Sequence, residues 1–333
     1  MPILGIIASS RFRSASAIAV AHFTSPRIST YPWSAGFGTK YADPATTPTG
    51  GGNDVAFTPS GDGIAIAHNV SPYISTYPWS SGFGTKYSNP ATLPTGDGGS
   101  VAFSPAGNAI AVAHTSSPYI SAYPWSAGFG SKYADPATLP TDAGGVSFSP
   151  SGDTIAMSAS SSPYIYAYPW SAGFGTKYAN PATLPGNLAL STAFTPSGNA
   201  VAVTDFNSPY VLVYPWSAGF GTKYANPATL PTGSGFGVTF SPSSDTIAVS
   251  HQSSPYISTY PWSSGFGTKY SNPATLPTGT GNAVAFTPSG DTIGIAHSTT
   301  PFITTYPWSS GFGTKYANPA TLPPNTAYGV AFN

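Results

Sequence analysis

Cysteine and glutamate are both absent from this chain of 333 residues, and charged side chains make up only 6% of it. The lack of cysteine excludes disulfides and thiolate metal sites. The formal net charge is zero, so the chain has no basic field that would attract the phosphates of nucleic acid or anionic lipid. Nucleic acid is therefore not an expected partner.

Long apolar runs are also missing. No stretch approaches the roughly 20 apolar residues that a membrane-spanning helix needs, so membrane insertion is not expected. No apolar period of three to four residues is sustained, and 37 glycines and 36 prolines would interrupt long helices. At the N-terminus, Met1 to Arg13 carry a short apolar run with the basic residues behind it, so we predict no signal peptide.

What the chain contains instead is a repeat. The peptide Tyr-Pro-Trp-Ser-(Ala/Ser)-Gly-Phe-Gly-(Thr/Ser)-Lys-Tyr occurs seven times, at spacings of 45 or 46 residues. Repeats of about 40 to 50 residues built from short strands are typical of β-propellers. We therefore predict an all-β protein with one domain, a seven-bladed propeller over residues 14–333, preceded by an N-terminal arm of residues 1–13 that is either an anchor or an extra strand.

Each unit is predicted to form a blade of four antiparallel strands. The first is Val-Ala-Phe, followed by a Ser/Thr-Pro-Ser-Gly-Asp turn. The second alternates β-branched residues with alanine, the third runs into Pro-Trp, and the fourth is Phe-Gly-Thr-Lys-Tyr. The chain begins at a second strand (18–22) and ends at a first strand (330–332), so the C-terminal strand is expected to pair with the N-terminal blade and close the ring.

This order of motifs resembles the WD-repeat propeller family over residues 14–333. The resemblance implies the propeller topology and, as one functional alternative, a scaffold for protein interactions. Two departures limit it: the Gly-His pair before the first strand is missing, and serine follows tryptophan where aspartate is expected. The hydrogen-bond network that the family builds from these residues is therefore not expected here.

The segment Ile3-Leu-Gly-Ile-Ile-Ala-Ser-Ser10 is similar to N-terminal segments of tailed-bacteriophage virion and tail-associated proteins. That resemblance implies that residues 1–13 bind other virion proteins and that the protein resides in a virion. A secreted or cytoplasmic location is the alternative.

The seven copies differ mainly in two links, one after the second strand and one between blades. Both should lie at the same end of the ring, and loops on a rigid scaffold are where binding residues usually sit. We therefore expect a host-surface glycan or protein to bind this variable face. The candidate binding residues are Phe23, Asn69, Asp97, Asp142, Asn187, Phe206, Phe236, Gln252 and Tyr328.

The opposite face repeats the same aromatic peptide in every blade. Its tryptophans are either packed between blades, which is the favoured interpretation, or form repeated sites for sugar rings. These tryptophans are Trp33, Trp79, Trp125, Trp170, Trp216, Trp262 and Trp308. One lysine per unit is interpreted as a charge on the outermost strand that discourages edge-to-edge association of sheets. One histidine in five of the units is interpreted as a hydrogen-bonding residue and not as a metal ligand.

No catalytic residue, metal or cofactor is predicted. The sequence has no paired carboxylates, nucleophile elbow or phosphate-binding loop, and its innermost strands repeat Val-Ala-Phe. We therefore expect a non-enzymatic structural or adhesive component of a bacteriophage virion that attaches to a host surface. The alternatives are a free multivalent lectin and a WD-repeat-like scaffold.

Overall fold

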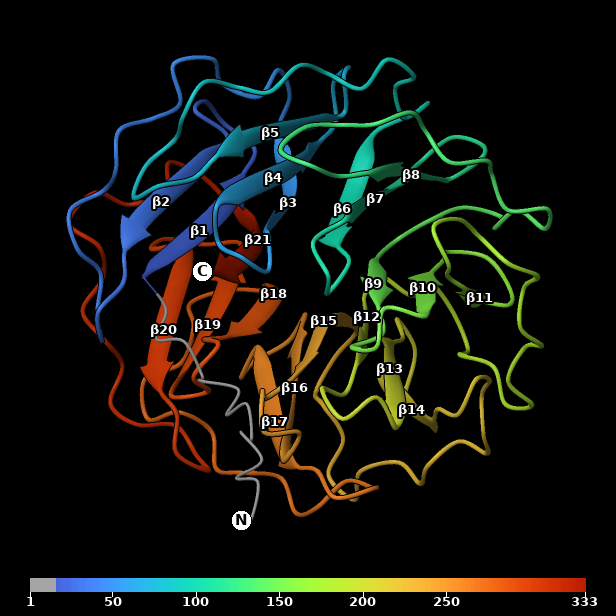
Figure 1. Cartoon of the computed structure of the whole chain (residues 1–333). Coiled ribbons are helices and arrows are strands. Elements are labelled where there is room, and N and C mark those ends of the chain that lie inside the picture. The colour runs from blue at the N-terminus through green and yellow to red at the C-terminus, as the bar shows by residue number, and fades with distance from the viewer. Residues whose placement is uncertain (1–15) are drawn as a thin grey trace, which may run out of the picture.

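The computed structural model describes residues 16–333, which form seven antiparallel sheets arranged in a ring (Figure 1). The predicted arm, residues 1–13, and the contacts expected of it lie outside the described residues. No helix within residues 16–333 has the length and apolarity that crossing a membrane requires. The all-β prediction is confirmed.

Each sheet has three strands, one at the central axis, one in the middle and one further out. The inner strands are β3 (Gly52–Phe57), β6 (Gly98–Phe103), β9 (Val146–Phe148), β12 (Thr192–Phe194), β15 (Gly235–Phe240), β18 (Gly281–Phe286) and β21 (Ala327–Phe332). The middle strands are β1 (Ala17–His22), β4 (Gly63–His68), β7 (Ala109–His114), β10 (Thr154–Ser158), β13 (Ala200–Thr204), β16 (Thr246–His251) and β19 (Thr292–His297). The outer strands are β2 (Ile28–Pro32), β5 (Ile74–Pro78), β8 (Ile120–Pro124), β11 (Ile165–Pro169), β14 (Val211–Pro215), β17 (Ile257–Pro261) and β20 (Ile303–Pro307).

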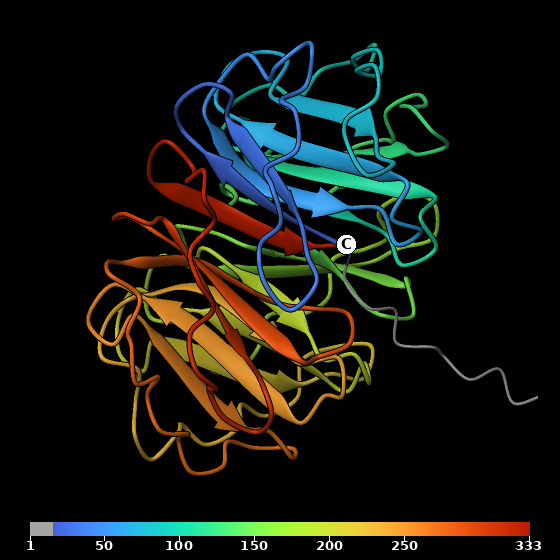
Figure 2. The ribbon, with the colours of Figure 1, turned by 90° about the vertical axis from the view of Figure 1, so that its left-hand side faces the viewer.

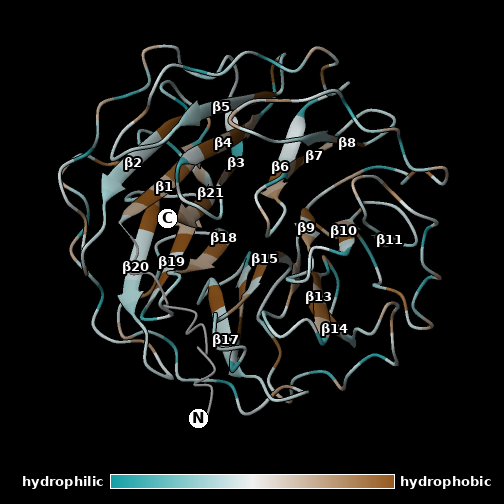
Figure 3. Cartoon of the chain, in the orientation of Figure 1, coloured by the Kyte–Doolittle hydropathy of each residue, from teal (hydrophilic) through white to brown (hydrophobic). Residues whose placement is uncertain are grey.

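The middle strands explain the alternation of β-branched residues with alanine. Every residue of β4 is buried, because both faces of this strand are covered by neighbouring blades. Ile64 and Ile66 of β4 pack against the alanines of β1, while Ala65 and Ala67 pack against Ile110 and Val112 of β7. Large side chains of one blade thus meet small side chains of the next, and the apolar bands follow the strands in Figure 3.

The predicted fourth strand is wrong. The Phe-Gly-Thr-Lys-Tyr segment makes one isolated bridge, between Trp33 and Phe37 in the first unit, and forms no strand in the described residues. Its backbone donates to the outer strand at two points, from Gly38 N–H to the Pro32 carbonyl and from Tyr41 N–H to the Thr30 carbonyl, both at 2.9 Å. The outer strand ends on Pro32, which has no N–H to donate in return, so a continuous ladder does not form.

The two ends of the chain meet in one blade. β21 pairs antiparallel with β1, with Ile18 opposite Phe332 and Val20 opposite Val330, in a sheet of order β2-β1-β21. In Figure 2 the last strand, in red, lies beside the first blue strands. Ser16 N–H donates to the Asn333 carbonyl at 2.9 Å, and Asn333 N–H donates to the Ala17 carbonyl at 3.0 Å. The N-terminal blade therefore takes its inner strand from the other end of the sequence.

Deletion of residues 327–333 should lower the melting temperature by about 10 °C or more. The deletion removes a buried strand, and each kcal/mol lost shifts a domain of this size by roughly 2–4 °C. Calorimetry of the truncated chain checks this, and a synthetic peptide of residues 327–333 should restore part of the loss. An unchanged melting temperature would show that β21 contributes little to the ring.

Aromatic contacts join each blade to the one before it. Trp79 packs edge to face against Phe83 of its own turn at 5.1 Å, Phe57 of β3 at 5.4 Å and Tyr41 of the preceding unit at 5.3 Å. The same contacts recur around the ring, and Trp33 meets Tyr316 of the last unit at 5.4 Å. The tryptophan peptide is thus a structural link between blades.

Replacing Trp125 with alanine should lower the free energy of unfolding by about 3–5 kcal/mol, since the indole is only 7% exposed. Phe23→Ala serves as the control, because this ring is 50% exposed and its loss should cost less than about 1 kcal/mol. Urea unfolding of both variants measures the difference. Equal losses would contradict the structural role of the tryptophan.

Candidate functional site

The axis of the ring holds two connected cavities. The inner cavity has a volume of about 170 Å³, and the one at the mouth about 310 Å³. Two rings of equivalent positions line them. The residue that precedes the Val/Thr of each inner-strand motif forms what we term the channel ring: Asp54, Ser100, Gly145, Ser191, Gly237, Ala283 and Gly329; all but Gly329 line the inner cavity. The preceding residue of each copy forms the mouth ring: Asn53, Gly99, Gly144, Leu190, Phe236, Asn282 and Tyr328.

A local irregularity of the inner strand positions these residues. In β3 the pairing with β4 shifts between Gly52 and Asp54, so Asn53 is an extra, unpaired residue. The same shift occurs in β6, β15 and β18. A β-bulge of this kind turns side chains away from the regular alternation. In these blades the bulge places the mouth-ring residue at the entrance and the channel-ring residue below it, whereas β9 and β12 start after their mouth-ring and channel-ring residues and have no bulge.

Asp54 is the one carboxylate that lines the inner cavity within the described chain. One of its oxygens accepts from the Ser100 hydroxyl at 2.8 Å and from Val101 N–H at 3.0 Å, and the other accepts from Val55 N–H at 2.8 Å. Burial raises the pKa of this carboxyl, and the three donors oppose that rise. A half-buried carboxylate with a raised pKa, open to a cavity, has the properties of a general base.

The residue type at each channel-ring position also determines whether the backbone N–H of the next blade has a side-chain acceptor. Ser100 and Ser191 each accept from the N–H of the valine that begins the next blade's motif, Val146 and Val238, both at 3.3 Å. Gly145, Gly237 and Ala283 have no side-chain oxygen to take that place. The N–H groups that follow them in the ring, of Thr192, Val284 and Val330, therefore lack this side-chain acceptor, and these three residues line the inner cavity.

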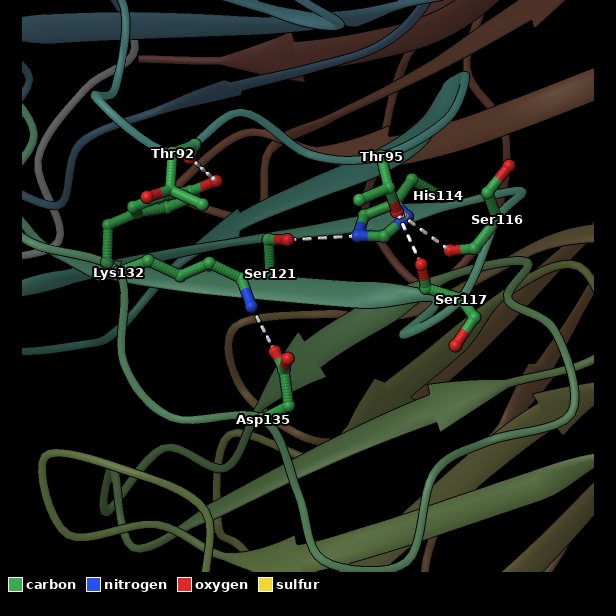
Figure 4. Close-up of polar contacts among 9 residues, drawn as sticks. Thr92, Thr95, His114, Ser116, Ser117, Ser121, Lys132 and Asp135 are labelled. Carbon is green, nitrogen blue, oxygen red and sulfur yellow. Dashed lines mark hydrogen bonds and ion pairs between the residues drawn. The ribbon is translucent and has the colours of Figure 1, made fainter.

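Among residues 16–333, no lysine or arginine lines either cavity. The repeated lysines lie in the peripheral segment, where each is held by an aspartate or asparagine three residues further on, as Lys132 is by Asp135 in Figure 4. The channel therefore offers hydroxyl, amide and backbone donors without a positive charge to neutralise a phosphate.

The two variable links do lie together, because their backbones are hydrogen-bonded to each other. Phe206 N–H donates to the Leu188 carbonyl at 2.9 Å, and Gln252 N–H donates to the Ser234 carbonyl at 3.0 Å. Of the nine candidate binding residues, Phe236 and Tyr328 line the mouth, and Phe206 packs on Phe236 with 5.8 Å between ring centroids. The others are Phe23, Asn69, Asp97, Asp142, Asn187 and Gln252, and none of these six lines the two channel cavities.

The predicted face thus contains the mouth, but the sequence analysis missed the channel ring. The signal was present: Val-Ala-Phe changes little among the copies, whereas the residue before it is Asp, Ser, Gly or Ala. At the alternative tryptophan site, Trp125 and Trp216 help to line cavities of about 400 Å³ and 150 Å³. Most of each indole is nevertheless buried, with 4–7% of it exposed, and it packs edge to face against three neighbouring aromatic rings, as Trp79 does.

The five histidines are fully buried in the middle strands. Each ring donates to or accepts from a serine or threonine of the outer strand through Nε2, as His114 does with Ser121 at 3.0 Å (Figure 4). Burial lowers the pKa of all five to about 4. In the other two blades both members of this histidine–hydroxyl pair are different residues. They are Ala159 and Tyr166 in one blade, and Asp205 and Leu212 in the next. Within residues 16–333 no three potential metal ligands come together.

The free energy of unfolding should fall as pH is lowered from about 6.5 towards 4. Unfolded histidines take up protons near pH 6.5, whereas the folded ones resist protonation until about pH 4. Urea unfolding at about pH 7 and about pH 5 measures the loss. His114→Ala, which copies Ala159, should reduce that loss by about a fifth, because it removes one of five similar contributors. A loss that does not change in this variant would contradict the assignment.

No family model matches the sequence, and no curated protein matches it. Solved structures do resemble the fold. A candidate 6-phosphogluconolactonase from Bacteroides fragilis is 14% identical with a TM-score of 0.74, over 97% of this chain and 99% of the other. Its counterpart from Bacteroides uniformis is 16% identical with a TM-score of 0.72, over 96% and 100%. The periplasmic gluconolactonase of Pseudomonas aeruginosa is 14% identical with a TM-score of 0.70, over 95% and 98%. At these identities the likeness shows the propeller fold alone.

These matches correct two predictions. The resemblances to WD-repeat propellers and to tailed-bacteriophage proteins find no support in them. The prediction of a non-enzymatic virion adhesin, with a lectin or scaffold as alternatives, is wrong, because the fold is one that proteins named as lactonases share. The physical reason for the error is the channel ring, whose polar residues lie just outside the repeated Val-Ala-Phe motif.

Proposed function

We propose that this protein is a hydrolase that opens an uncharged lactone in the central channel. The observation that carries the proposal is Asp54, a half-buried carboxylate fixed by three donors at the wall of a cavity. Lactone hydrolysis needs a base for the attacking water and donors for the oxygen that becomes negative, and the channel offers both. The names of the similar structures support this reaction class.

The steps follow from the positions of these groups. Asp54 accepts a proton from a water molecule as its oxygen attacks the lactone carbonyl carbon. The negative oxygen that results accepts from inward-facing N–H groups such as those of Thr192, Val284 and Val330. The ring C–O bond then breaks, and the proton held by Asp54 passes to the departing alkoxide. The product is a hydroxy acid, and Asp54 returns to its ionised form.

Ser100 has a positioning role in this scheme. Its hydroxyl donates to the Asp54 oxygen that also accepts from Val101 N–H, so the other oxygen, which accepts only from Val55 N–H, has a lone pair left for water. The cavity linings formed by the described part of the chain contain no lysine or arginine, which favours an uncharged lactone over a phosphorylated one.

Asp54→Asn should lower kcat/KM for lactone hydrolysis by roughly 100-fold or more, because the amide cannot accept the proton. Acid release from δ-valerolactone and glucono-δ-lactone, corrected for the uncatalysed reaction, measures this. Asp54→Ser copies the residue at Ser100 and Ser191 and provides a second variant that should fold. Asp97→Asn, at an exposed aspartate outside the channel, is the control and should keep full activity.

Two outcomes count against the proposal. Wild-type protein that hydrolyses neither lactone faster than buffer would overturn the reaction class. Wild-type activity that survives in both Asp54 variants, with melting temperatures unchanged, would overturn the role of Asp54 alone.

A further inference from the structure

The mouth ring has an apolar side. In ring order its residues are Asn53, Gly99, Gly144, Leu190, Phe236, Asn282 and Tyr328. Leu190 and Phe236 belong to adjacent blades, and Leu190 lies three blades along the ring from Asn53. Ala143 also lines the mouth cavity, and Phe206 packs against Phe236. We call Ala143, Leu190 and Phe236 the apolar arc.

Two asparagine amides supply hydrogen-bonding groups at the mouth, and one of them, Asn53, directly precedes Asp54 in the chain. The Asn53 amide donates to the Gly98 carbonyl at 2.8 Å, and the Asn282 amide donates to the Ala327 carbonyl at 2.7 Å. Each amide keeps a second N–H for a ligand. The mouth therefore has one hydrogen-bonding amide next to the carboxylate, at Asn53, and one beside Phe236, at Asn282, while Leu190 and Phe236 lie on the blades furthest from Asn53.

The two large side chains of the apolar arc, Leu190 and Phe236, are specific to two blades. The equivalent positions in other blades are mostly glycine or asparagine, which suit a wet channel entrance. Leu190 and Phe236 are only partly buried, so packing within the ring covers part of their surface and leaves the rest facing the cavity. That surface gains hydrophobic stabilisation only when a ligand covers it.

One ligand can reach both sides. The mouth and inner cavities share six lining residues, among them Asn53, Leu190 and Phe236, so they are one continuous space. The mouth, at about 310 Å³, lies within the size range of small-molecule pockets. A molecule whose carbonyl group lies near Asp54 would extend its other end over the apolar arc.

We propose that the apolar arc binds an alkyl or aryl substituent of the lactone, which makes hydrophobically substituted lactones the preferred substrate class. This rests on the proposed function for the reaction, while the binding site itself can be tested without it. A fully hydroxylated sugar lactone would bury hydroxyl groups against Leu190 and Phe236 without partners, at a cost that an alkyl chain avoids.

The test compares a short lactone with a long one. Wild-type protein should hydrolyse δ-decalactone with a kcat/KM at least about tenfold above that for δ-valerolactone. Leu190→Asn and Phe236→Asn, which copy the residue at Asn53 and Asn282, should lower the value for δ-decalactone by about tenfold and leave δ-valerolactone within about twofold. Leu139→Thr is the matched control, because Leu139 is 41% exposed, lies outside the channel, and has threonine as its equivalent at Thr47.

Binding of inert analogues separates this inference from the reaction. Calorimetric titration with δ-valerolactam and an alkyl-substituted δ-lactam should show tighter binding of the alkylated compound, and Leu190→Asn should remove the difference. Tighter binding of the alkylated lactam, in a protein that hydrolyses no lactone, would support the apolar arc as a binding site and contradict the proposed lactonase function. Equal binding of the two lactams, or no binding of either, would overturn the apolar arc whatever the activity.

Discussion

Everything in this ring depends on the edge-to-face contact between the tryptophan of one unit and the tyrosine of the unit before it. The contact joins consecutive blades at 5.2–5.5 Å in every unit, and Tyr316 with Trp33 extends it across the ends of the chain. Large-to-small packing of the middle strands completes the interface between blades. Because these contacts are the same in each blade, stability is distributed evenly around the circle.

An evenly built scaffold leaves the axis free to vary. The channel ring and the mouth ring sit where the inner strands begin, around the axis and away from the tryptophan contacts between blades. At Gly145, Gly237 and Gly329 the inner strand approaches the next blade closely, whereas Asp54, Ser100 and Ser191 hydrogen-bond to the next blade, so each blade can carry its own channel residue. Asp54 on one blade and Leu190 on another illustrate this division between a repeated framework and an unrepeated centre.

The repeat predicted much of the fold, and local backbone geometry decided the rest. The period and the Val-Ala-Phe and Ile-Ala-Val motifs predicted seven blades and the order of three strands in each. The predicted fourth strand does not form, because the outer strand that it would pair with ends in proline. The turn between them, at Ala35 and Gly36, also has positive φ values of 50° and 144°. The channel was missed because the bulge at Asn53 changes which residue faces the axis, and strict alternation along a strand cannot reveal a bulge.

The pairing of β21 with β1 has a wider consequence for the chain. Since the first and last residues described meet in the same blade, the order of the units is circular and the position of the termini is one choice among seven. A circularly permuted chain that begins at the equivalent position of any other unit should therefore form the same ring of blades. Asp54 would keep its relation to Leu190 in every such permutant, because that relation depends on the number of blades between them and not on where translation starts.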